Sequence, residues 1–149
     1  MEEAWRLEHS VECEVTKEFA WSFWTHVPNW KLDADVEAVE LDGPFAEGSS
    51  GATITRSFGR VAWRIVMVKA ESEAVLEIPA PGAVVRFHWI FQDLSGRTRI
   101  TQQVGIEGEQ AALIVGMIAA GLESGIPAGM QKLCESMVKA AKGPLPSAR

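Results

Sequence analysis

Apolar and polar residues alternate along much of the chain, which is the pattern of strands that bury one face. The clearest case covers residues 5 to 15, where Trp5, Leu7, His9 and Val11 share one parity and mainly charged residues hold the other. Further strand-like runs follow, with short connections rich in turn residues between them: DVEAVEL, GATITRSF, RVAWRIVMV, AVLEI, VVRFHWIF and TRITQQVGI. Runs connected in this way predict an antiparallel meander.

Two segments have helical periodicity instead. Thr16 can cap a short helix in which Phe19, Phe23 and Trp24 fall on one face, and Pro28 ends it. Residues 109 to 142 are rich in Ala, Met, Leu and Ile and predict one long helix. The order of strand, short helix, six strands and long helix predicts an α+β fold, in which a curved antiparallel sheet of about seven strands wraps around the long C-terminal helix.

The aromatic stretch FAWSFWTHVPNW, residues 19 to 30, holds three of the six tryptophans. Phe19, Phe23 and Trp24 lie on one helical face and are interpreted as core, because each such side chain buries roughly 150–250 Å². Trp21 falls off that face and is expected to pack where the short helix meets another element. Trp30 follows Pro28 at a corner, where it can line the mouth of a cavity.

The composition indicates a globular protein without a nucleic-acid partner. The chain has 149 residues, 47% of them hydrophobic, and a formal net charge of −6. Binding to a phosphate backbone depends mainly on Lys and Arg, so this charge argues against it. We expect one domain over residues 1–142 and a flexible tail over 143–149. Monomer and weak homodimer both remain open.

Cys13 and Cys134 lie far apart, with no CxxC pair or Cys/His cluster around them, so no metal and no cofactor are expected. We expect reduced thiols in a cytoplasmic protein. The N-terminus lacks the order of a signal peptide. The longest apolar run, residues 111 to 122, is shorter than the roughly 20 residues of a membrane helix. It predicts a buried helix and no stable membrane insertion.

Several motifs, in the order of elements above, resemble the START-like or SRPBCC superfamily, which includes polyketide cyclase/dehydrase and lipid-transport proteins. The matching stretches are HSVECEV, FAWSFWTHVPNW, LDGPFAEGSSG, APGAVVRFHWIF and DLSGRTRITQQVGIEG. The resemblance covers nearly the whole chain and implies a helix-grip fold with a cavity between the sheet and the C-terminal helix. Two positions depart from the family pattern: His26 stands where many relatives have Asp, and NWKLD lacks the second tryptophan of the usual corner.

Polar residues with inward parity are the main site candidates, because burial without a partner costs about 1–3 kcal/mol. His9 and Gln102 have this parity, and Arg56 shares that of Ile54 but can also reach water. The alternative for His9 is a core histidine whose hydrogen bonds are satisfied, and for Gln102 a role in the cavity stays open. His88 is expected on the outer face. The ligand-binding candidates are His9, Trp30, Arg56, Trp63, Trp89, Gln102, Met117 and Met130.

The stretch SGIPAG in the long helix predicts a kink or break at Pro127, with Gly121, Gly125 and Gly129 serving either close packing or a hinge. Met117 and Met130 flank it and suit an adaptable apolar pocket.

Sequence fingerprints of common enzymes are absent: the chain has no GxSxG, HExxH, P-loop or GxGxxG motif. If there is acid/base chemistry, His9 is the only candidate for the proton carrier. The first hypothesis is therefore a protein that binds a small hydrophobic molecule, such as a lipid or a polyketide. A cofactor-independent cyclase or dehydratase is the first alternative, and a protein-interaction module without a ligand is the second.

Overall fold

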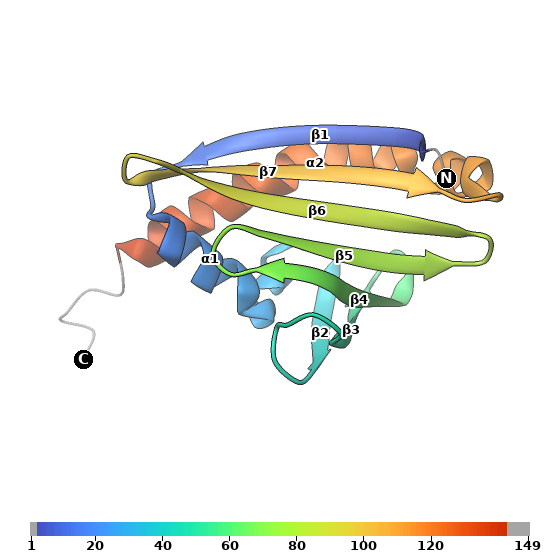
Figure 1. The fold of residues 1–149 in the computed structure, drawn as a ribbon, viewed down its shortest axis with the longest axis horizontal. Helices are drawn as coiled ribbons and strands as arrows, with labels where there is room; N and C mark the ends of the chain where they lie inside the picture. Colours follow the sequence, from blue (N-terminus) through green and yellow to red (C-terminus); the bar gives the residue numbers. More distant parts are fainter. Residues whose placement is uncertain (1–2, 143–149) are drawn as a thin grey trace.

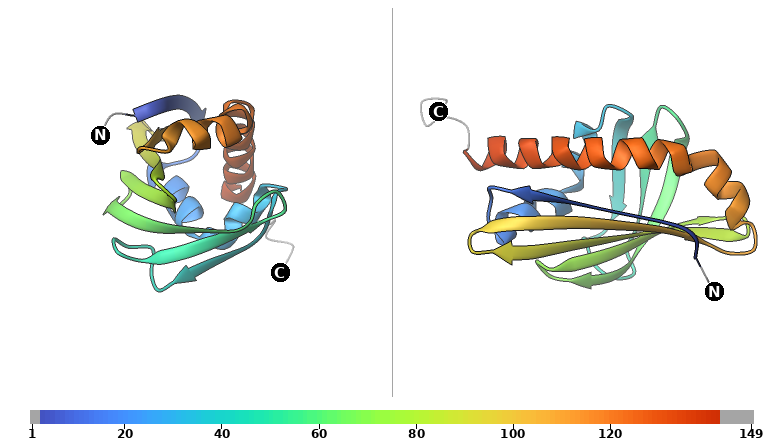
Figure 2. Two further views of the ribbon diagram at one scale, coloured as in Figure 1. Left: turned by 90° about the vertical axis from the view of Figure 1, so that its right-hand side faces the viewer. Right: turned by 90° about the horizontal axis from the view of Figure 1, so that it is seen from above.

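The fold is an antiparallel sheet with the helices on its concave side (Figures 1 and 2). The computed structural model describes residues 3–142, so the predicted tail at 143–149 lies outside the described residues. The elements in chain order are β1 (Glu3–Cys13), α1 (Lys17–Thr25), the 3₁₀ helix η1 (Val27–Leu32), β2 (Val36–Asp42), β3 (Ser50–Thr55), β4 (Gly59–Lys69), β5 (Glu73–Ala80), β6 (Ala83–Leu94), β7 (Arg97–Glu107) and α2 (Ala111–Ala141).

The sheet has seven strands in the order β1-β7-β6-β5-β4-β3-β2, and all neighbouring pairs are antiparallel. The predicted helix-grip architecture is confirmed. Strands β2 to β7 follow one another as a meander, whereas β1 pairs with β7 and closes the other edge. Because side chains alternate across a strand, one face of all seven strands turns toward the helices.

The inner face of the sheet supplies most of the core. One row runs across five strands by direct pairing, from Leu7 through Val104, Phe87 and Leu76 to Ile65. Val104 and Ile65 are fully or almost fully buried, whereas Leu7 and Phe87 are half-buried. The helices and the core therefore cover the inner face completely at Val104 and Ile65, and only partly at Leu7 and Phe87.

Helix α1 begins at the predicted cap, because the backbone N–H of Phe19 donates to the Thr16 hydroxyl at 3.1 Å. It ends at Thr25, before the predicted end at Pro28, and η1 then carries the chain to Leu32, so Pro28, Asn29 and Trp30 all lie within η1. The side chains of Asn29 and Trp30 nevertheless close α1. The Asn29 amide donates to the Phe23 carbonyl at 2.9 Å, and the Trp30 indole donates to the Trp24 carbonyl at 2.7 Å. These bonds satisfy carbonyls that a helix end leaves without partners.

Helix α2 runs for 31 residues and lies alongside β1 at the edge of the sheet (Figures 1 and 2). Its C-terminal half buries Ile126, Met130, Leu133 and Met137. Its N-terminal half packs on the core along one side only, where Ile114, Val115, Ile118 and Leu122 are half-buried. On the opposite side Leu113 and Met117 are 63% and 62% exposed. The expectation that the run 111–122 is buried holds for one of its sides.

The expected interruption at SGIPAG is wrong, because α2 continues through Pro127 without a break. Pro127 cannot donate to the Glu123 carbonyl, but Glu123 is exposed, so water can replace the missing bond. The bend that Figure 2 shows lies toward the orange, N-terminal end of the helix. The glycines do not mediate close packing either: a Cβ at Gly121, Gly125 or Gly129 would meet nothing within 4 Å.

By length and composition alone, α2 is apolar enough to cross a membrane, and only 17% of its most apolar window is buried. A core helix passes the same test. Because Met130 and Met137 are enclosed and Cys134 is bonded to β1, α2 is part of the packed fold.

Candidate functional site

Three of the predicted site residues form one row across the inner face of the sheet. His9 on β1 pairs directly with Gln102 on β7, and Gln102 pairs with Trp89 on β6. Directly paired residues in an antiparallel sheet have Cβ atoms about 4.5–5.5 Å apart on the same face. The structure therefore brings together a histidine, an amide and an indole from three strands.

Gln102 differs from the other buried polar residues in having no partner. Within residues 3–142, the buried polar or charged side chains are Glu77, Thr98, Thr101 and Gln102. Glu77 binds two arginines, Thr98 donates to the Val15 carbonyl, and Thr101 bonds to Ser10. Gln102 is only 7% exposed, yet its side chain makes no hydrogen bond in the described part of the chain.

The amide of Gln102 faces space that solvent can enter. No fully enclosed side-chain nitrogen or oxygen among residues 3–142 lacks a partner, so both amide atoms of Gln102 must keep some accessible surface. Burying an amide without a partner costs about 1–3 kcal/mol. Such a group inside an apolar layer is a place where a ligand can supply the missing hydrogen bonds.

His9 is half-buried and has no hydrogen-bond partner in the described residues. The interpretation as a satisfied core histidine is therefore wrong. With Cys13 bonded to Cys134 and rises of about 3.3 Å per strand residue and 1.5 Å per helix residue, His9 lies about level with residue 125 of α2. The apolar side chains that α2 turns inward at that level are Leu122 and Ile126.

An aromatic cluster borders the row. The ring centroids of Trp24 and Trp89 are 4.9 Å apart, and Trp24 also packs on Trp21, Trp30 and Phe91. Trp24 is 3% exposed, whereas Trp89 and Trp21 are half-buried. The stretch FAWSFWTHVPNW is thus mainly core. Trp89, which pairs with Gln102, is half-buried and so remains partly accessible to solvent or to a ligand.

The remaining candidates lie away from this row. Trp63 is buried, donates to the Thr53 hydroxyl at 2.9 Å and packs on Trp30 at 5.2 Å between ring centroids. Met130 is enclosed in the core. Met130 is surrounded by protein, whereas Trp63 also borders a hollow at the sheet.

Two of the inward expectations need correction. Arg56 lies just beyond β3 with a side chain that is 70% exposed and paired to Glu37 at 3.5 Å. The parity argument fails there because Ile54 itself belongs to the outer face, as its partner Arg60 on β4 shows. Met117 is on the exposed side of α2, since the centre of the arc that packs on the core lies about a third of a turn away from it.

Two hollows of the described residues lie on the outer face of the sheet. The larger, of about 410 Å³, lies over β2 to β5 and is lined mainly by polar residues such as Asp42, Arg60 and Arg64. The smaller, of about 150 Å³, is lined by Arg6, Arg86, His88, Gln103, Val104 and Gly105. The predicted apolar cavity is not one of these two.

The outer face is tied together by ion pairs. Glu77 on β5 accepts from Arg64 at 3.1 Å and from Arg86, which also reaches Glu107 at 3.0 Å. Burial by itself raises the pKa of Glu77, but the hydrogen bonds from Arg86 and Arg64 together bring it below its ordinary value. His88 bonds to Glu73 at 2.7 Å, as its predicted outward parity requires.

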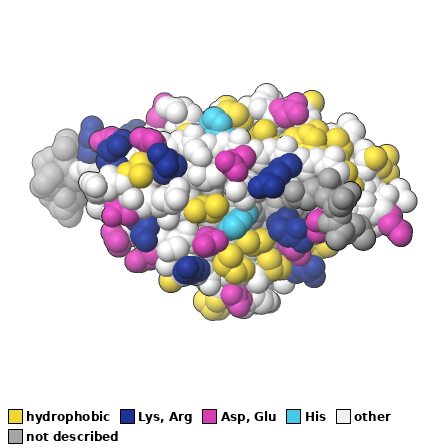
Figure 3. Space-filling model, turned by 45° about the horizontal axis from the view of Figure 1, so that its top comes forward, with side chains coloured by type: hydrophobic (Ala, Val, Ile, Leu, Met, Phe, Trp, Pro, Cys, Tyr) yellow, Lys and Arg dark blue, Asp and Glu magenta, His cyan; other side chains and the backbone are white. Residues whose placement is uncertain are grey.

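Charges on the face drawn in Figure 3 are mixed, with Lys and Arg interspersed among Asp and Glu. This face has no continuous basic patch of the kind that binds nucleic acid. Among residues 3–142, no three His, Cys, Asp or Glu side chains are grouped so that they could hold a metal ion.

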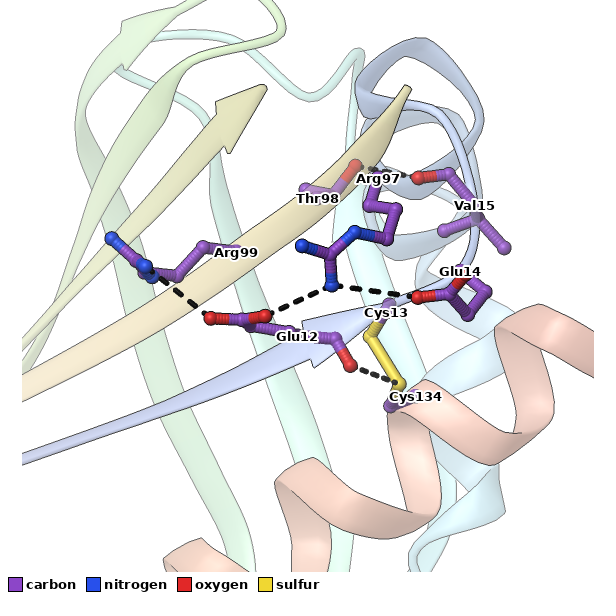
Figure 4. Close-up of polar contacts among 8 residues, drawn as sticks. All are labelled: Glu12, Cys13, Glu14, Val15, Arg97, Thr98, Arg99 and Cys134. Carbon is purple, nitrogen blue, oxygen red and sulfur yellow. Dashed lines mark hydrogen bonds and ion pairs between the residues drawn. A yellow bond between two sulfur atoms is a disulfide. The ribbon is translucent and has the colours of Figure 1, made fainter. Parts of the chain in front are cut away.

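The expectation of reduced thiols is wrong: Cys13 and Cys134, which are 121 positions apart in the chain, form a disulfide with Cα atoms 5.5 Å apart (Figure 4). It joins the end of β1 to α2. The sequence carries a signal for this pair, because Cys13 shares the inward parity of His9, and Cys134 lies one helical turn from the core residues Met130 and Met137. The argument for a cytoplasmic location from free thiols therefore falls away, since disulfides persist mainly in oxidising compartments.

Ion pairs flank the disulfide on the outer side of β1 (Figure 4). Glu12 accepts from Arg97 at 3.0 Å and from Arg99 at 3.3 Å, and Arg97 also reaches Glu14 at 3.5 Å. The hydrogen bonds from Arg97 and then Arg99 lower the pKa of the Glu12 carboxyl. Together with the disulfide, they hold β1, β7 and α2 together at one end of the inner face.

No family model matches the chain, and no curated protein matches its sequence significantly. Solved structures do match its fold. An aromatase/cyclase, Zhui from Streptomyces sp. R1128, is 14% identical, with a TM-score of 0.75 over 93% of this chain and 96% of that one. Norcoclaurine synthase from Thalictrum flavum, in complex with dopamine and hydroxybenzaldehyde, is 12% identical, with a TM-score of 0.71 over 94% and 89%.

Ara h 8.0201 is 11% identical, with a TM-score of 0.71 over 91% of this chain and 98% of that one. These solved structures belong to the START-like, or SRPBCC, superfamily. At such low identity the likeness concerns the fold. The resemblance found in the sequence motifs is confirmed at that level: the chain has the helix-grip fold of the START-like superfamily.

Proposed function

We propose that the protein binds a small, mainly apolar molecule with one polar group, held between the inner face of the sheet and α2. The observation that carries this proposal is Gln102, a residue that is 7% exposed and whose side-chain amide has no protein partner in residues 3–142. In the empty protein the amide is mostly shielded and only partly reached by water, so its desolvation is incompletely compensated. A ligand that hydrogen-bonds to it recovers the loss.

The surroundings of Gln102 define the chemical class of the ligand. Next to it, His9 offers a second polar group, and Trp89 offers an aromatic face. The next row along the sheet is apolar, with Leu7 and Phe87 half-buried. A carbonyl or hydroxyl group at one end of an apolar body fits this arrangement, because an amide can both donate and accept. Lipids and polyketides both contain such groups.

The fold neighbours support a small ligand with an apolar body and a polar group. The norcoclaurine synthase structure contains dopamine and hydroxybenzaldehyde, two small aromatic molecules with polar substituents. Those ligands belong to that protein. They support the proposal because the same fold accommodates molecules of the proposed class in a neighbour of similar length.

The test is the affinity of a hydrophobic fluorescent probe, 8-anilinonaphthalene-1-sulfonate, for Gln102→Leu and for a matched control, Gln103→Leu. Gln103 is the next residue on β7 but points outward and donates to Glu8 at 2.8 Å. Loss of one net hydrogen bond of about 0.5–1.5 kcal/mol predicts roughly 2- to 12-fold weaker binding by Gln102→Leu. Gln103→Leu should bind like the parent protein. Equal affinities in all three proteins, or no binding by any, would contradict the proposal; the second result favours an interaction module without a ligand.

A second candidate function, a cyclase or dehydratase, is favoured by His9. Its half-buried imidazole has no partner in the described residues and lies opposite Gln102. A histidine so placed can transfer a proton to or from a bound substrate, while Gln102 holds a carbonyl oxygen. His9→Phe should then lower turnover of a polyketide-like substrate by roughly 10²- to 10⁴-fold with little change in its binding. Equal loss of binding and turnover would instead assign His9 to binding alone.

A further inference from the structure

We propose that the polar group of the ligand is uncharged and binds at the pair of His9 and Gln102, and that the apolar body extends from there along the N-terminal half of α2. This inference rests on the binding role proposed above and adds the charge and the orientation of the ligand. It favours alcohols, ketones and amides over carboxylates and ammonium compounds, because the former bond to an amide without bringing a charge.

The pair of His9 and Gln102 lies within an apolar layer. In the rows on either side of it, the inner face of β1, β7 and β6 carries only apolar side chains: Leu7, Val104 and Phe87 on one side, and Val11, Ile100 and Phe91 on the other. Glu8, the charged residue next to His9 in the chain, points outward and accepts from Gln103 at 2.8 Å. No carboxylate, lysine or arginine of these rows therefore faces the pair.

A charged group of a ligand would have no counter-ion at this pair. Among residues 3–142, the buried charged side chain is Glu77, which is on the outer face and bonds to Arg64 and Arg86. Taking an ion out of water without a counter-ion costs far more than the neutral hydrogen bonds of one amide return. A hydroxyl or carbonyl group loses less hydration, and the Gln102 amide offers it both donors and an acceptor.

The remaining accessible surface gives the direction of the apolar body. On α2, Ile126 is buried, whereas Ile118 and Leu122, which precede it, are half-buried. On β6, Phe91 is 2% exposed, whereas Phe87, on the other side of Trp89, is half-buried. Covering apolar surface that water still reaches is favourable. The body of the ligand therefore lies on the side of Phe87 and Leu122, away from the disulfide.

The length of this side indicates suitable probes. From His9 to Trp5, the half-buried inner residue near the start of β1, the distance is about 13 Å at 3.3 Å per residue. Extended 1-decanol has a similar length. Decanoate and decylammonium have the same chain length and differ from it in the charge of the head group.

The first experiment measures the affinities of these three probes by calorimetry at pH 8.5, above the range in which imidazole ordinarily titrates. We expect 1-decanol to bind at least about tenfold more tightly than either ion. Gln102→Leu should weaken 1-decanol roughly 2- to 12-fold and change the ions less than about twofold, because their heads stay in water. Gln103→Leu, on the outer face, is the control and should behave like the parent protein.

The second experiment places a counter-ion at the pair. Gln102→Glu keeps the size and shape of the side chain but adds a carboxylate. The affinity for decylammonium relative to 1-decanol should then rise at least about tenfold, because the ammonium group gains a partner. This variant tests the same claim if Gln102→Leu does not fold. An unchanged ratio in Gln102→Glu would overturn the inference.

Three results of the first experiment would also overturn it: decanoate that binds the parent protein as tightly as 1-decanol, a preference for 1-decanol that is unaltered in Gln102→Leu, or no binding of 1-decanol. The proposed function has a separate readout in 8-anilinonaphthalene-1-sulfonate, whose anilino N–H can reach Gln102 while its sulfonate stays in water. If binding of that probe depends on Gln102, these results reject only the uncharged ligand. If it does not, the proposed function fails as well.

Discussion

Gln102 on β7 lies directly across the antiparallel ladder from His9 on β1, and neither side chain has a hydrogen-bond partner within residues 3–142. Cross-strand pairs on a buried face are normally apolar or bonded to each other. This pair is neither, although the same sheet satisfies Thr98 and Thr101 a few residues away. The unpaired groups are concentrated where the inner face is only partly covered, which favours a binding role for them.

The first prediction concerns stability without a ligand. Gln102→Leu should raise the free energy of unfolding by up to about 1–2 kcal/mol, because it removes a buried amide that has no partner. The matched control is Thr98→Val, which removes a buried hydroxyl that donates to the Val15 carbonyl at 2.8 Å and should lower stability by about 1 kcal/mol. Urea unfolding measures both. A similar loss in both variants would show that Gln102 is structurally satisfied.

The second prediction concerns the disulfide. Replacing Cys13 and Cys134 together by alanine should lower stability by about 2–5 kcal/mol, because the bond closes a loop of 121 residues in the unfolded chain. A reducing agent should destabilise the parent protein by a similar amount and leave the alanine variant unchanged. Thermal unfolding with and without the reductant measures this. A parent protein that is insensitive to reduction would contradict the prediction.

The third prediction is a pH dependence from Glu77. Because its pKa in the folded protein is lowered by Arg86 and Arg64, its contribution to stability is present above the ordinary value of 4.5 and is lost as the pH falls through the folded pKa. Glu77→Gln should lower stability at pH 7 by about 1.5–3 kcal/mol and have a smaller effect at pH 3. Glu37→Gln, which removes an exposed pair with Arg56, is the control and should cost less than about 1 kcal/mol. An equal effect of Glu77→Gln at both pH values would contradict this account.

The fourth prediction concerns Gly51 on β3. A Cβ at this position would collide with the ring of Trp63, which is held by the Thr53 hydroxyl and by packing on Trp30. Gly51→Ala should therefore cost about 1–3 kcal/mol and change the tryptophan fluorescence. Gly116→Ala, in open space on α2, should be neutral or stabilising. An unaltered emission spectrum together with unchanged stability in Gly51→Ala would contradict the prediction.

Much of the fold could be predicted because local patterns determine it. Alternation of apolar residues gave the inner face of β1 and β7, and the cap at Thr16 gave the start of α1. His9, Trp89 and Gln102 were placed on one face by parity alone, and strand pairing then placed them side by side. Parity misplaced Arg56 because Ile54, the apolar residue that shares its parity, belongs to the outer face of the sheet.

The features that could not be predicted from the sequence depend on contacts between distant segments. The bond between Cys13 and Cys134 joins residues 121 positions apart, and no local pattern records that distance. The exposure of Met117 depends on α2 lying along the edge strand β1 rather than across the middle of the sheet. Pro127 predicts a helix break, but the residue whose carbonyl loses its partner, Glu123, is exposed, so water can replace the bond and the helix continues.

The most direct test of a ligand site at Gln102 is the nuclear magnetic resonance signal of its side-chain amide during titration with 8-anilinonaphthalene-1-sulfonate. Gln102 and Gln103 are neighbours on β7 that face opposite sides of the sheet, so Gln103 serves as an internal reference. The account predicts that the amide signals of Gln102 shift in a saturable manner and that those of Gln103 stay in place. Saturable binding of the probe with unchanged Gln102 signals would contradict it.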